Sequence, residues 1–103
     1  MSDMTAMSEF QALVTAIGEY TVDALGRENL TGMQVTLNPR EMAAFMSIAL
    51  EDRSDAAQKA AISELFEIER VYSDEVVLTY VFVDEVSEPA DSALESVPQF
   101  SLV

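Results

Sequence analysis

The stretch VVLTYVFV, residues 76–83, consists almost entirely of β-branched and aromatic residues. Side chains of these types fit the half-buried surface of a pleated sheet, so the stretch predicts a strand. A lone strand leaves its backbone N–H and C=O groups unpaired, and it therefore requires neighbouring strands. Where those neighbours lie in the chain decides the fold class.

The segment before this strand fits two structures. Leu65, Ile68 and Tyr72 recur at spacings of three and four, as in a helix that continues from residues 56–64. Phe66, Ile68 and Tyr72 share the parity of a strand, and Ser73-Asp74-Glu75 is typical of a turn. We favour a hairpin of residues 66–72 with 76–85, and the helical alternative stays open.

In this hairpin the two faces of the strands differ in character. The first face is the natural core and carries Phe66, Ile68, Tyr72, Val77, Thr79, Val81 and Val83. The second face combines apolar residues with two carboxylates and carries Glu67, Glu69, Val71, Leu78, Tyr80 and Phe82. Either another part of the chain covers this second face, or it is a contact surface for a partner or a second copy.

The N-terminal half predicts a helix at residues 9–25. Ser8 and Gln11 match a capping box, apolar residues follow one helical face, and Gly26 stands just past the end. Gly18 lies inside this helix, where glycine costs about 1 kcal/mol relative to alanine. A close crossing by another helix or strand would explain it.

The central part predicts a short strand at residues 33–37 and a helix at residues 39–53. The helix is indicated by Asn38 as a cap, Pro39 in the first turn and a face that includes Met42, Phe45 and Met46. A further helix is expected at residues 56–64. The expected order is α-β-α-α-β-β, an α+β two-layer domain with about three mostly antiparallel strands and two to three helices on one face.

The chain of 103 residues suits one domain. We expect a flexible N-terminus at residues 1–7 and a single acidic domain at residues 8–86. Residues 87–103 contain Pro89 and Pro98 among serines and acids, and we expect them to form a flexible acidic tail.

The strongest feature of the composition is its charge, with 19 acidic and 5 basic residues and a net charge of −14. The excess is concentrated in the second half, and no basic residue follows Arg70. Such a chain repels nucleic acid and anionic membranes, so we expect neither to bind directly. It attracts basic proteins.

Several classes of chemistry lack their residues. The chain has no cysteine and no histidine, its only lysine is Lys59, and it has three glycines and no glycine-rich phosphate loop. No EF-hand spacing accompanies the carboxylate pairs. We therefore expect no enzyme, no cofactor and no metal. No signal peptide and no apolar run of about 20 residues is present, which favours a cytoplasmic protein.

The function that these features favour is a regulator or inhibitor that binds a basic surface of a partner protein. In its sharpest form its carboxylates mimic the phosphates of nucleic acid, and small acidic cysteine-free proteins of mobile elements and viruses have similar compositions. The residues expected to bind the partner are Glu67, Glu69, Asp74, Glu75, Leu78, Tyr80, Phe82, Asp84 and Glu85.

Two alternatives explain the same features. The chain could be an assembly subunit that forms a homodimer through Leu78, Tyr80 and Phe82, with its acidity serving solubility. The acidity could also be an adaptation to high salt.

Overall fold

A computed structural model describes residues 2–86 and 98–102, and the side chains from Glu9 onward within these ranges. The chain begins with helix α1 (Ser2–Leu25) and a short 3-10 helix η1 (Arg27–Asn29). Strands β1 (Leu30–Asn38) and β2 (Ala43–Leu50) follow, then helix α2 (Asp55–Tyr72), strand β3 (Val77–Phe82) and strand β4 (Gln99–Leu102). Helix α1 begins at Ser2, within the N-terminal stretch that was expected to be flexible. Strand β4 lies within the expected flexible tail of residues 87–103.

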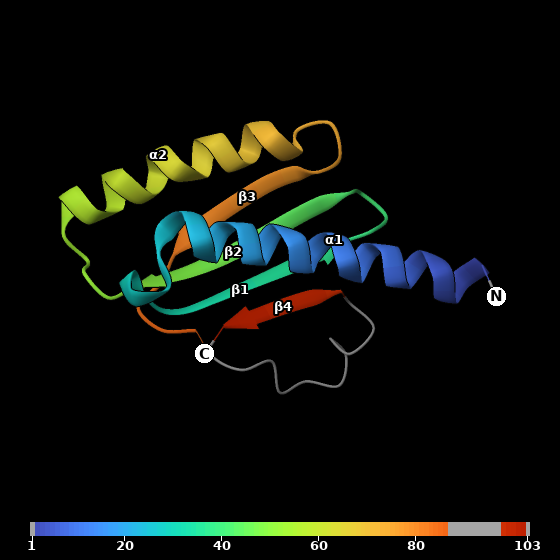
Figure 1. The fold of residues 1–103 in the computed structure, drawn as a ribbon, viewed down its shortest axis with the longest axis horizontal. Helices are drawn as coiled ribbons and strands as arrows, with labels where there is room; N and C mark the ends of the chain where they lie inside the picture. Colours follow the sequence, from blue (N-terminus) through green and yellow to red (C-terminus); the bar gives the residue numbers. More distant parts are fainter. Residues whose placement is uncertain (1, 87–97, 103) are drawn as a thin grey trace.

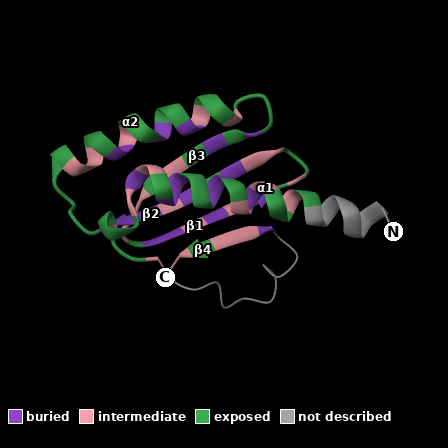
Figure 2. Cartoon of the chain, viewed as in Figure 1, coloured by how far each residue is buried: buried purple, intermediate pink, exposed green. Residues whose placement is uncertain are grey.

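The described strands form one sheet of order β3-β2-β1-β4, and both helices lie on the same side of it (Figure 1). β1 is antiparallel to β2 and β4, whereas β3 is parallel to β2. α1 packs over β1 and β4, and α2 contacts α1 and β3. The buried residues lie between the helices and the sheet (Figure 2). The α+β class is confirmed, with a mixed sheet of four strands in place of about three.

The helix predicted at residues 39–53 is wrong, because β2 occupies most of this range. The Asn38 Oδ1 atom accepts hydrogen bonds from the backbone N–H groups of Arg40, at 3.0 Å, and Glu41, at 3.4 Å. It therefore closes a turn in place of capping a helix. Met42 has a φ of 51°, in the left-handed region, and the chain then returns beside β1. Ala44 and Met46 face the helices with the alternation of a strand.

The hairpin of residues 66–72 with 76–85 is also wrong, because α2 continues to Tyr72. Ser54 is the N-cap and its hydroxyl accepts a hydrogen bond from the Ala57 N–H at 3.2 Å. Leu65 and Ile68 are fully buried on the face toward the sheet. The helical pattern that the sequence left open is therefore the correct one, and β3 pairs with β2 instead.

The contact between α1 and β4 explains the glycine inside this helix. A Cβ at Gly18 would overlap the Phe100 ring, so the glycine permits strand β4 to lie against the helix, as the sequence suggested. Thr21 is buried, and its hydroxyl donates a hydrogen bond of 2.7 Å to the Ile17 carbonyl. The helix ends before Gly26, whose φ is 90°. The C-terminal half of α1 thus packs against the sheet.

Candidate partner-binding surfaces

The predicted carboxylates lie in three separate places. Glu67 and Glu69 belong to α2, and since helical residues two apart point about 200° away from each other, they do not form a pair. Asp74 and Glu75 are exposed in the turn before β3. The third place, Asp84 and Glu85, is exposed after β3, at the opposite end of that strand. The structure therefore does not bring the predicted acidic residues together.

The apolar members of the predicted set face the helices. Leu78 is 5% exposed within the core, and Tyr80 and Phe82 pack against the core with ring centroids 6.0 Å apart. This is opposite to the orientation expected from the sequence. The reason is that β3 follows a helix and joins β2 in parallel, so no hairpin partner sets its register. The outward positions are Val77, Thr79 and Val81.

A groove follows the junction of α1 and α2. One hollow of about 310 Å³ lies between the C-terminal end of α1 and the first half of α2. A second hollow continues from it and shares Ala24 and Glu64 in its lining. Three small residues of α2, Ala57, Ala60 and Ala61, line the first hollow at helical spacing. Their short side chains leave an apolar floor between the two helices.

Carboxylates stand along this groove. Asp52 and Glu64 line the first hollow, and Asp23, Glu64 and Glu67 line the second with Tyr20. Hydrogen bonds from the backbone and hydroxyl of Ser54 lower the pKa of Asp52, which keeps this carboxylate charged. The groove thus has an apolar floor and a negatively charged rim.

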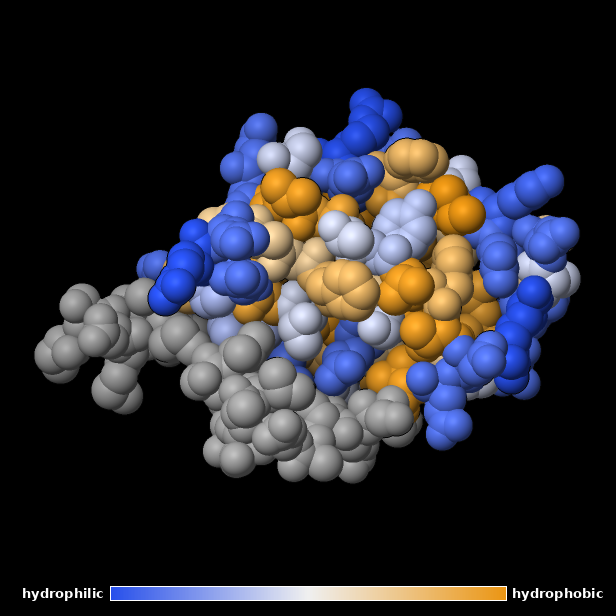
Figure 3. All heavy atoms as spheres, turned by 180° about the vertical axis from the view of Figure 1, so that it is seen from behind, coloured by the Kyte–Doolittle hydropathy of each residue, from blue (hydrophilic) through white to orange (hydrophobic). Residues whose placement is uncertain are grey.

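The other side of the sheet differs from the acidic groove in being uncharged, because none of the four described strands contains a charged residue. Figure 3 shows this open face, where apolar residues lie among weakly polar ones and most of the strongly hydrophilic residues lie around the margin. Its largest exposed side chains are Phe45 (46% exposed), Val77 (65%) and Val81 (40%). A hollow of about 430 Å³ beside Phe45 is lined by residues of β1, β2 and β3, including Thr36 and Thr79.

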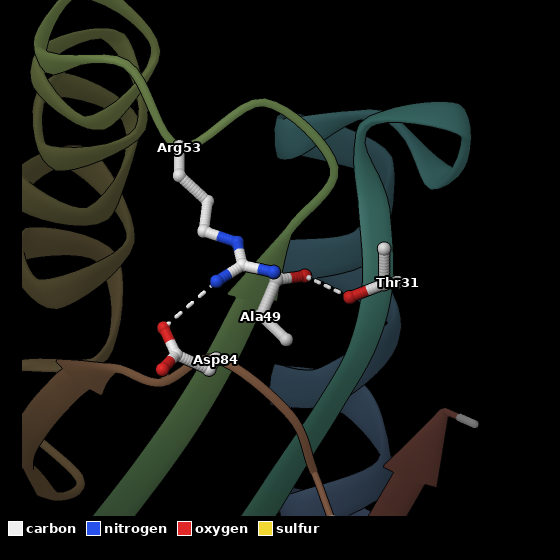
Figure 4. Close-up of polar contacts among 4 residues, drawn as sticks. All are labelled: Thr31, Ala49, Arg53 and Asp84. Carbon is white, nitrogen blue, oxygen red and sulfur yellow. Dashed lines mark hydrogen bonds and ion pairs between the residues drawn. The ribbon is translucent and has the colours of Figure 1, made fainter.

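The end of the open face near the C-terminus of β2 is covered by the chain that follows β3. Val86 lies over Gly32, since a Cβ on this glycine would be 3.3 Å from the Val86 Cβ. Arg53 and Asp84 join the segments at this end through an exposed ion pair of 3.0 Å (Figure 4). Thr31 also donates a hydrogen bond of 3.3 Å to the Ala49 carbonyl between β1 and β2 (Figure 4). The centre of the open face, around Phe45, stays exposed.

Sequence reasoning missed most of the groove. Asp23, Asp52 and Glu64 were not among the predicted binding residues, although Glu67 was. A signal was present in α2, where Ala57, Ala60 and Ala61 precede Glu64 at helical spacing. Such a stripe predicts a helix face with short side chains. Only the tertiary structure shows which helix lies next to this face.

Within the ranges that the structure describes, no group of three or more acidic side chains is arranged to hold a metal ion. None of the described helices is long and apolar enough to cross a bilayer. Comparisons of the chain with protein-family models, with curated proteins and with solved structures find no match. The two surfaces, the groove and the open face, therefore carry the functional argument alone.

Proposed function

We propose that this protein binds a basic segment of a partner protein in the groove between α1 and α2, and that it acts as a regulator or inhibitor of that partner. The observation that supports the proposal is the apolar floor of the groove beneath a rim of Asp23, Asp52, Glu64 and Glu67. An amphipathic segment with apolar and Lys or Arg side chains offers the matching chemistry.

The two parts of the groove make different contributions. Burial of apolar side chains on Ala57, Ala60 and Ala61 supplies affinity that depends little on salt. The rim carboxylates attract the segment and fix its register, and this contribution decreases as salt screens exposed charges. Tyr20, which is 42% exposed at one end of the groove, adds an aromatic surface for a lysine or arginine.

The test is binding of a synthetic amphipathic lysine–leucine helix, measured by fluorescence anisotropy at about 0.05 and 0.5 M NaCl. We expect binding to weaken at the higher salt concentration. Glu64→Gln and Asp23→Asn should each weaken binding about two- to fivefold, the size of one partly exposed ion pair. A glutamate–leucine peptide of the same length is the negative control.

The matched variant is Glu9→Gln, which removes one negative charge from an exposed position of α1 outside the groove lining. It should bind the lysine–leucine peptide like the wild type. Equal affinity at both salt concentrations, or equal losses for Glu9→Gln and Glu64→Gln, would show that the groove is not the site.

Mimicry of nucleic acid remains the sharper form of this proposal. If the basic segment belongs to a nucleic-acid-binding site, a DNA or RNA duplex should compete with this protein for the partner. Simultaneous binding of the protein and the duplex would exclude mimicry and leave the groove proposal intact.

A further inference from the structure

We infer that the open face of the sheet is an interface between two copies of this chain, packed sheet against sheet around a twofold axis. The inference does not depend on the groove, which lies on the other side of the molecule (Figures 1 and 3). It rests on three properties of the open face: its lack of charge, the shape around Phe45 and its distance from the charged elements.

The absence of charge selects the kind of partner. The chain has 24 charged residues, yet β1, β2, β3 and β4 contain none. On the described strands of this face, a basic partner would find no carboxylate to pair with. A second copy presents an equally neutral centre, so burial of the face leaves no ion unpaired there.

The shape of the face fits twofold self-association. Phe45 is 46% exposed on β2, and the hollow of about 430 Å³ beside it is lined by Thr36, Ala43 and Thr79. A projecting ring next to a hollow is self-complementary, because a twofold axis places the ring of each copy over the hollow of the other. Val77 and Val81 extend the apolar surface along β3.

The net charge of −14 does not prevent this arrangement. Two packed sheets lie about 10 Å apart, and each helix layer, about 10–12 Å thick, lies on the outer side of its sheet. The outer surfaces of the helices are then several Debye lengths apart, because this length is about 8 Å at physiological ionic strength. Electrostatic repulsion between the two copies then comes mainly from the turns around the margin, where Asp74 and Glu75 lie.

The size of the face sets the expected strength. The outward positions of the described strands number about a dozen, whereas a standard interface has about 20–30 residues on each side. We therefore expect a dimer in the micromolar range that dissociates on dilution. Its affinity should be unchanged or higher at high salt, opposite to peptide binding in the groove.

The test is the mass of the full chain by sedimentation velocity, from low-micromolar to sub-millimolar protein. Thr79→Lys places an ammonium group on the edge strand β3, directly beside Phe45, and Phe45→Ala removes the projecting ring. Each should weaken the dimer at least about tenfold. Ser63→Lys makes the same type of charge change at an exposed position of α2 and should leave the dimer intact. Circular dichroism checks that Thr79→Lys, at an exposed position, retains the fold.

A dimer for the wild type and Ser63→Lys, lost in Thr79→Lys and Phe45→Ala, supports the inference. Two results would overturn it: a monomer at every concentration, which leaves the face to residues 87–97 or to a different partner, and a dimer that Thr79→Lys does not weaken, which places the contact elsewhere. Neither result affects the groove proposal, since groove binding is measured by peptide affinity.

Discussion

The two sides of this sheet are formed by the same strands but differ in how far their side chains are buried. On the covered side, Met33, Val35 and Met46 are fully buried beneath two helices that carry many of the charged residues. On the open side, Phe45 and Val81 are apolar and exposed, and no charged residue interrupts the strands.

The difference shows that the charged residues lie on the helices, turns and loops and are absent from the described strands. An acidic chain usually keeps its exposed surfaces charged, and an uncharged face with large exposed apolar side chains indicates a contact region. The covered side owes its stability to packing inside the chain. The open side contributes little to that packing, so its composition points to an interaction outside it.

Strand β3 offers the sharpest test, because adjacent residues lie on opposite sides of the sheet. Leu78→Lys places an ammonium group in the core, where Leu78 is 5% exposed, and should lower the free energy of unfolding by about 3–5 kcal/mol. Val77→Lys changes a side chain that is 65% exposed and should lower it by less than about 1 kcal/mol. Urea denaturation measures both values.

Similar losses in these two variants would contradict the distinction between the sides of the sheet. A larger loss for Val77→Lys than for Leu78→Lys would mean that the strand has the opposite orientation, the one that the sequence alone suggested. Denaturation at protein concentrations below the dimerisation range keeps self-association out of the comparison.

The next effect concerns the edge of the covered side, where β4 lies against α1. Gly18→Ala gains about 1 kcal/mol of helix propensity, but its Cβ overlaps the Phe100 ring. Since overpacking costs about 1–3 kcal/mol, the net result should be a modest loss of stability. In a Phe100→Ala background the overlap is gone, and Gly18→Ala should instead stabilise the protein. Urea denaturation of the four chains of this double-mutant cycle measures the change of sign.

An unchanged effect of Gly18→Ala in the two backgrounds would show that Phe100 does not contact the helix in solution. β4 would then be absent from the sheet or docked in another way. The open face would extend to different residues, and the dimer inference would need a different boundary.

The parts of the fold that follow from the sequence are those with a single periodicity. The apolar face of α1, with Val14 and Ile17, fits only a helix, and the alternation around Met33 and Val35 fits only a strand. The helix prediction failed at residues 43–50 because nearly every position there is apolar. The spacing of a helix and the alternation of a strand both match such a stretch. Pairing with β1 decided between them.

The orientation of β3 and the groove could not be predicted for a related reason. Val77 and Leu78 are equally suited to a core, and only the parallel pairing with β2 places Leu78 inside. The groove requires Asp23 of α1 to meet Glu64 of α2, residues about 40 positions apart that no local pattern connects. The expectation of a basic partner comes from the charge composition alone, and tertiary structure was needed to propose a site for it.

The smallest expected effect tests whether α1 and α2 stay packed against each other at the end of the groove that Tyr20 lines. Tyr20 of α1 and Tyr72 of α2 meet edge to face, with ring centroids 6.1 Å apart. Burial raises the pKa of Tyr72 above its ordinary value, and the negative charge of Glu75 and the nearby Tyr20 raise it further.

A raised pKa favours the neutral phenol in the native state, so its contribution to stability is complete below the ordinary tyrosine pKa and is lost as pH rises through the native pKa of Tyr72. The free energy of unfolding should therefore decrease above about pH 10, and decrease less in Tyr72→Phe. Urea denaturation at stepwise increasing pH measures the difference. The same pH dependence in both chains would mean that water reaches the Tyr72 ring and that α1 and α2 separate at this end. The groove would then form only around its partner, whereas the open face, supported by strand pairing, would keep its shape without one.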